Sequence, residues 1–132
     1  MSEELQSIHE KELVQEEQQE KEKVHAVGEF QLLLNEVVEL QAMCRSRPFR
    51  KIWEWVQDVK REHNINWKNE ETPKEMVARQ QQMKFIEQLE RQVGNKVSEL
   101  NQFCERFPLF RGEFTARARW FPDTGVVEIQ YK

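Results

Sequence analysis

The sequence predicts a mainly α protein, an antiparallel helical bundle or hairpin with one long helix, followed by a C-terminal two-stranded β-hairpin. From Thr72 to Phe107 an apolar residue recurs every three or four positions, which is the period of an amphipathic helix. Residues 113–132 instead alternate apolar and polar side chains around a turn sequence. Hydrophobic residues make up 38% of the chain and charged residues 33%. That balance fits long helices with a thin or shared core better than a globule.

The chain begins with an acidic arm, residues 1–23. Residues 1–25 hold eight Glu and three Lys, a net charge of −5, whereas residues 26–132 hold sixteen acids and seventeen bases, a net charge of +1. Glu, Gln and Lys favour helix, but the arm has too few apolar residues to dock strongly on a core. High charge and low hydrophobicity are also typical of disorder. The sequence therefore leaves two structures open for the arm, a solvated helix or a disordered tail.

Residues 24–107 are predicted to form a helical core with helices at about 24–43, 48–62 and 73–106. The first helix carries two adjacent rows of apolar residues, which make a wide apolar face, and it could be continuous with the arm. Pro48 separates it from the second helix, because a proline disfavours helix at the preceding residue and suits a first helical turn. The stripe predicted to be buried in the second helix is Phe49, Ile52, Trp53, Val56 and Val59. Ile65 and Trp67, in the following polar loop, are expected to fold back onto the body.

The third helix has the clearest start signal. Thr72 and Glu75 have the spacing of a capping box, and Pro73 occupies the first helical position. From Met83 onward its apolar stripe is close to the heptad repeat of a coiled coil. Gly94 is a predicted weak point where the helix could bend or break. The stripe is longer than the second helix can cover, so the first helix or a second chain must cover the rest, and we expect a homo-oligomer.

The C-terminal segment, residues 113–132, is predicted to be a β-hairpin. Its turn sequence "PDTG" combines proline and aspartate for a type I turn with a glycine for positive φ. If Phe121 pairs with Val126, the apolar residues of both strands fall on one face, and Arg119 lies opposite Glu128 on the other. Two strands alone are marginal in water, so this face must pack on a helix or on another subunit.

The residue types that carry chemistry are not arranged as a catalytic or metal site. The serines lack a glycine elbow, the histidines are scattered, and Cys44 and Cys104 fall on apolar stripes. There is no HExxH or CxxC sequence and no glycine-rich phosphate loop. We therefore expect no enzyme, no cofactor and no bound metal. The start of the chain does not read as a secretory signal, and no apolar stretch is long enough for a membrane span. A cytoplasmic protein with free thiols is expected, not secreted and without membrane contact.

Two groups of residues are candidates for contacts with partners. Exposed aromatic and apolar side chains often anchor protein interfaces. The partner-docking candidates are Trp55, Trp67, Phe114, Trp120, Val127, Ile129 and Tyr131. The second group is a basic cluster, Arg45, Arg47, Arg50 and Lys51, which could bind phosphate or another anion. A solvated corner, or pairing with nearby glutamates, would explain the basic cluster without any ligand.

The middle of the chain resembles a known group of proteins. "SRPFRKIWEWVQDVKREHNI", a polar spacer and "KEMVARQQQMKFIEQLERQV", within residues 44–93, are similar to small helical proteins encoded among the head and structural genes of tailed bacteriophages. The resemblance implies a virion or assembly component, located in the bacterial host cytoplasm or in the virion. It implies no catalytic residue.

These observations favour a non-enzymatic structural or adaptor protein that acts by oligomerisation and by docking to protein partners. Two alternatives remain open from the sequence. The protein could be a small nucleic-acid-binding regulator that uses the basic cluster at residues 45–51, which we favour less because the chain lacks a strong basic excess. It could also be an inhibitor of a host factor that acts through the acidic arm.

Overall fold

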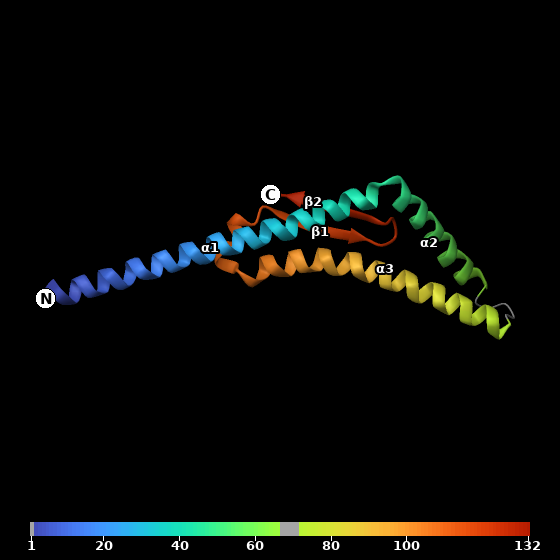
Figure 1. The fold of residues 1–132 in the computed structure, drawn as a ribbon, viewed down its shortest axis with the longest axis horizontal. Coiled ribbons are helices and arrows are strands. Elements are labelled where there is room, and N and C mark those ends of the chain that lie inside the picture. Colours follow the sequence, from blue (N-terminus) through green and yellow to red (C-terminus); the bar gives the residue numbers. More distant parts are fainter. Residues whose placement is uncertain (1, 67–71) are drawn as a thin grey trace.

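The computed structural model describes residues 2–66 and 72–132, with side chains described for residues 10–64 and 72–132. It confirms a mainly α protein with a C-terminal β-hairpin (Figure 1). The elements are α1 (Ser2–Arg45), α2 (Arg47–Asn66), α3 (Pro73–Arg106), a short 3₁₀ helix η1 (Pro108–Glu113), β1 (Ala116–Phe121) and β2 (Val126–Tyr131).

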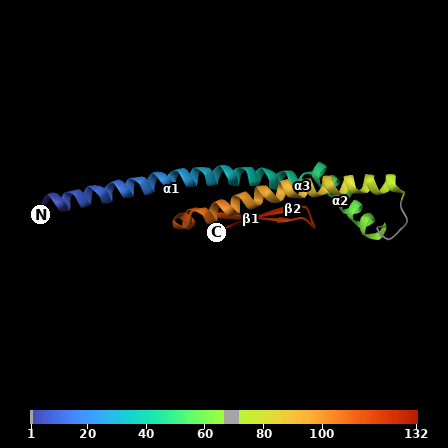
Figure 2. The ribbon, with the colours of Figure 1, turned by 90° about the horizontal axis from the view of Figure 1, so that it is seen from below.

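Helix α1 joins the acidic arm and the first predicted core helix in one continuous element. Its first half projects beyond the rest of the molecule in two perpendicular views (Figures 1 and 2). Residues 10–22 are all exposed, and burial begins around Ala26. The helix ends near Ser46, whose hydroxyl donates to the Met43 carbonyl (2.6 Å) and accepts from the Phe49 N–H (3.4 Å). These bonds satisfy backbone groups at the end of α1 and at the start of α2.

Helix α2 is longer than predicted, because it continues through polar residues to Asn66. Four of the five residues predicted for its buried stripe are buried, and Trp53 is among the most enclosed side chains. The prediction for Ile52 is wrong, since 46% of its surface is exposed. Ile52 lies on the flank of α2 that none of the described elements covers. The expected packing of the Ile65 side chain and of Trp67 lies outside the described side chains.

Helix α3 starts with the predicted capping box. Thr72 accepts from the Glu75 N–H (3.2 Å), and the Glu75 carboxylate accepts from the Thr72 N–H (3.3 Å). The helix passes through Gly94 without interruption, so it does not break there. Gly94 lies beside the Trp120 ring, and this contact supports the helix at its weak point. Burial along α3 begins only at Ile86, and Met76 near its start is exposed.

The β-hairpin has the predicted register at every pair, from Ala116 opposite Tyr131 to Phe121 opposite Val126. Gly125 in the turn has φ +66°, as the turn sequence predicted. The hairpin packs against this chain's own helices, with β1 beside α3 and β2 beside α1. Figure 2 shows the hairpin on one side of the pair formed by α1 and α3.

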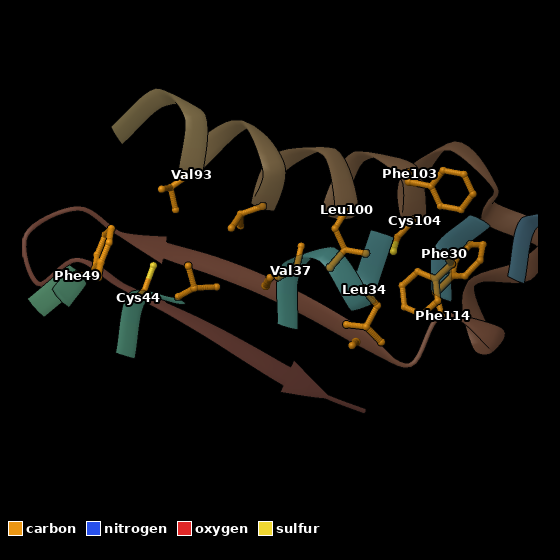
Figure 3. Packing of buried hydrophobic residues seen from close by; sticks show 14 of the residues in the cluster. Phe30, Leu34, Val37, Cys44, Phe49, Val93, Leu100, Phe103, Cys104 and Phe114 are labelled. Atoms are coloured by element: carbon orange, nitrogen blue, oxygen red, sulfur yellow. The ribbon is translucent and has the colours of Figure 1, made fainter. Parts of the chain in front are cut away.

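The core is a single cluster that all main elements share. Phe114, just before β1, contacts Phe30 of α1 and Phe103 of α3, with ring centroids 5.1 and 5.7 Å apart. Figure 3 shows these rings at one end of the cluster and Phe49 at the other end. The hairpin therefore seals one side of the helix pair, and the opposite side has no comparable cover among the described elements.

Candidate interaction surfaces

The structure divides the docking candidates on the hairpin into buried and exposed residues. Phe114 and Val127 have no exposed surface, so they stabilise the chain's own fold and are not free to dock a partner. Trp120 is half-buried and meets Trp53 edge to face, with centroids 5.4 Å apart. Ile129 is also partly buried against the core, whereas Tyr131 is 66% exposed. Of the hairpin candidates, Tyr131 alone offers most of its side chain to a partner.

Both edges of the hairpin are partly covered by side-chain amides. The Asn101 carboxamide of α3 donates to the Ala118 carbonyl (2.7 Å) and accepts from the Ala118 N–H (3.0 Å). On the other edge, the Gln41 amide of α1 donates to the Val127 carbonyl (3.1 Å). Open strand edges can pair with a strand of another chain. These amides occupy both outward groups of Ala118 on β1 and the Val127 carbonyl on β2, which disfavours that mode of docking at these positions.

Arg50, one of the anion-binding candidates, makes contacts within the fold. Its guanidinium donates to the carbonyls of Cys44 (2.9 Å), Thr124 (2.9 Å) and Gly125. One side chain thus joins the end of α1 to the hairpin turn. Gln57 of α2 adds a hydrogen bond to the Asp123 carbonyl in the same turn.

The other three residues of the basic cluster form an exposed basic corner, which we define as Arg45, Arg47 and Lys51. Within the part of the chain that the structure describes, none of the three makes an ion pair. The corner lies where α1 turns into α2, at the opposite end of α1 from the acidic arm (Figure 1).

An apolar surface lies on the side of the helices away from the hairpin. Trp55 of α2 is 42% exposed and contacts Phe85 of α3, which is 54% exposed, with ring centroids 6.3 Å apart. One turn further along α3, Leu89 lines a hollow between α1 and α3 together with Leu40 and Met43. A second hollow, lined by Leu32 and Leu33 of α1 and by Phe103 of α3, follows further along the same groove. We call this surface the hairpin-free face, and its members are Leu32, Leu33, Leu40, Met43, Ile52, Trp55, Phe85 and Leu89.

Sequence reasoning identified only part of the hairpin-free face. Trp55 was a candidate because it lies off the predicted stripe of its helix. Phe85 and Leu32 lie off their stripes in the same way, and both stand directly beside stripe residues. For Trp55, Phe85 and Leu32 the available signal was therefore a large apolar residue next to the stripe rather than on it, whereas Ile52 lies on the predicted stripe and gave no such signal.

The resolved pKa shifts follow from surface ion pairs and from burial. The Glu113 carboxylate, 3.0 Å from the Lys23 ammonium, raises the pKa of Lys23 where the acidic arm meets the body. Across the groove, Glu36 and Glu99 raise the pKa of Lys96. Burial raises the pKa of the Cys44 and Cys104 thiols, which disfavours the reactive thiolate.

Two further properties hold for the residues that the structure describes. They contain no group of three or more His, Cys, Asp or Glu placed to hold a metal ion. None of the helices among them combines the length and the apolar character that crossing a membrane requires.

The fold and its surfaces define a mainly α protein in which a β-hairpin covers one side of two long antiparallel helices and an apolar face lies on the other side. Comparison with models of known protein families gave no match. Comparisons with curated proteins and with solved structures gave no match either.

Proposed function

We propose that this chain is a non-enzymatic structural or adaptor protein, and that it acts through contacts of its hairpin-free face with protein partners, including copies of itself. The observation that carries the proposal is the exposure of Trp55 and Phe85 beside the apolar groove between α1 and α3. Contiguous apolar surface of this kind marks interaction sites in soluble proteins, and tryptophan is enriched among residues that dominate binding. Full burial of a large apolar side chain contributes about 1.5–3 kcal/mol.

The resemblance of residues 44–93 to small helical proteins of tailed bacteriophages supports a more specific proposal. The contacts would then serve a phage particle or its assembly. Trp55 and Phe85 both fall within that stretch of sequence.

The nucleic-acid alternative now depends on the basic corner alone, since Arg50 is engaged by three backbone carbonyls. Three exposed cations could still bind phosphate. If Arg47→Glu abolishes salt-dependent retention of DNA or RNA and leaves the solution mass unchanged, the regulator is the better proposal.

The test of the proposal is the solution mass by light scattering over a range of concentrations. The full chain should have the mass of more than one copy. Trp55→Glu combined with Phe85→Glu should lower the mass to one copy, because a carboxylate in an apolar interface is costly to desolvate. Leu109→Glu is the matched control, since Leu109 is 84% exposed and lies on η1, outside the hairpin-free face.

The control should keep the wild-type mass. Circular dichroism should show that all three proteins keep their helical content. A full chain that stays a single copy at high concentration would overturn the proposal. So would a double variant that associates as strongly as the wild type.

A further inference from the structure

We propose that α1 of a second copy lies antiparallel along α1, so that each acidic arm covers part of the partner's hairpin-free face and reaches its basic corner. This inference rests on the proposed self-association and adds to it a contact made by α1. Three observations carry it: the lengths of the two halves of α1, the charges at its two ends, and the residues along one face of the helix.

The first observation is length. Helix α1 has 44 residues. Residues 2–23 form the projecting arm, and residues 24–45, an equal number, lie along the body (Figures 1 and 2). Because the helix rises about 1.5 Å per residue, each half spans roughly 33 Å. An antiparallel pair centred near residue 24 therefore places each arm along the whole body half of its partner.

The second observation is charge complementarity. Residues 2–23 contain all eight Glu and all three Lys counted in the N-terminal segment, a net charge of −5. Residues 45–51, which include the basic corner, contain three Arg, one Lys and no acid. The arm is the N-terminal half of α1, and residues 45–51 lie at the C-terminal end of α1 and the start of α2. Antiparallel pairing brings unlike charges together at both ends, whereas parallel pairing would bring like charges together.

The third observation is the pattern along one helical face of the arm. Lys11, Val14 and Lys21 follow helical spacing, and the same face continues along α1 to Leu32 and Met43 of the hairpin-free face. In a pair centred near residue 24, Val14 lies level with Leu33 of the second copy.

In the same pair, Lys11 lies level with Glu36 of the second copy. The groove beside Leu33 is lined by Glu29 and Glu99, while Arg106 and Lys96 are the basic residues along it. The apolar residue of the arm would thus meet an apolar position, and Lys11 would lie level with an acidic residue. A pair of this kind is closed and uses the same surface on both copies.

Charge reversal with rescue tests the contact between arm and corner. Glu3→Arg with Glu4→Arg reverses the tip of the arm, and Arg45→Glu with Arg47→Glu reverses the corner. Each pair alone should weaken association by about tenfold or more, because several exposed ion pairs are lost at two symmetric sites and each contributes a small factor. The protein that carries all four substitutions should regain most of the wild-type affinity. Lys84→Glu with Arg91→Glu, at exposed positions on a different face of α3, is the control with the same charge change as the corner variant.

Disulfide trapping tests the direction of pairing. A single added cysteine at His25, which lies near the centre of α1, should give a covalent dimer under mild oxidation. A cysteine at Val14 or at Met43, on the same face of α1 as His25, should not, since those positions lie far from their own copies in an antiparallel pair. Parallel pairing would link all three, and head-to-tail pairing would link none. The native Cys44 and Cys104 are buried, which limits their part in the reaction.

The outcomes separate this inference from the proposed function. If the full chain is a single copy, both fail. The chain could associate while the variant with all four substitutions associates no more tightly than either reversed pair. It could also associate while His25→Cys does not crosslink. In either case self-association stands and the antiparallel contact is wrong. Restored association in the variant with all four substitutions, together with crosslinking only at position 25, supports both the proposed function and the antiparallel contact.

Discussion

Replacement of Gly125 by alanine tests how the hairpin turn fits against the helices. Gly125 has φ +66°, a conformation that costs an L-residue with a side chain about 1–2 kcal/mol. A Cβ at this position would also lie 2.5 Å from Cγ and Cδ2 of the Trp53 ring. Trp53 is 2% exposed and cannot move without disturbing the core, and overpacking of this kind costs about 1–3 kcal/mol. Gly125→Ala should therefore lower the free energy of unfolding by about 2–5 kcal/mol, a large part of a typical total.

The measurement is urea denaturation followed by far-UV circular dichroism, with the slope checked for two-state behaviour. Gly112→Ala is the matched control, because Gly112 has open space around it and no positive φ. Gly125→Asn separates the two causes, since asparagine tolerates positive φ but brings the same Cβ. If the contact with Trp53 dominates, the asparagine variant should be nearly as unstable as the alanine variant. A Gly125→Ala protein within about 0.5 kcal/mol of the wild type would refute the close approach of turn and ring.

Three further predictions concern the contacts that hold the hairpin and the buried thiols. Asn101→Leu removes both hydrogen bonds to Ala118, so the free energy of unfolding should fall by about 1–3 kcal/mol. The Ala118 amide should also show faster hydrogen exchange by NMR, and an unchanged exchange rate would contradict this. Arg50→Lys keeps the charge but cannot reach three carbonyls at once, so the urea midpoint should fall, and an equal midpoint would show that the charge alone suffices. Stability should also decline as pH rises above about 9, because burial raises the pKa of Cys44 and Cys104 above the ordinary 9.0 and the unfolded chain loses those protons first. A urea midpoint that stays constant through alkaline pH would contradict the last prediction.

The hairpin and the start of α3 could be predicted because their signals are local. Strand alternation, the turn sequence and the pairing of Arg119 with Glu128 all specify one register, and the structure has that register. The capping box of Thr72 and Glu75 is likewise contained within four residues and needs no tertiary contact.

The predictions that failed depend on which element covers which surface. Ile52 has the correct helical spacing for burial but lies on an uncovered flank of α2. Phe114 and Val127 were docking candidates because the sequence does not say whether the hairpin packs on its own helices or on a partner. Their burial follows from the position of the hairpin between α1 and α3, which no local pattern encodes.

The basic cluster shows why a local electrostatic rule can mislead. Cations at the start of α2 oppose the dipole of that helix, and a bound anion would offset this cost. The same residues, however, also follow the last turn of α1, where unpaired carbonyls carry partial negative charge. Arg50 uses this second environment when it donates to the Cys44 carbonyl. Arg45 in the last turn of α1 is favoured there for the same reason. The positive charge of the corner is thus stable without a ligand, and only a rescue experiment such as the charge reversal above can show that it also recognises a partner.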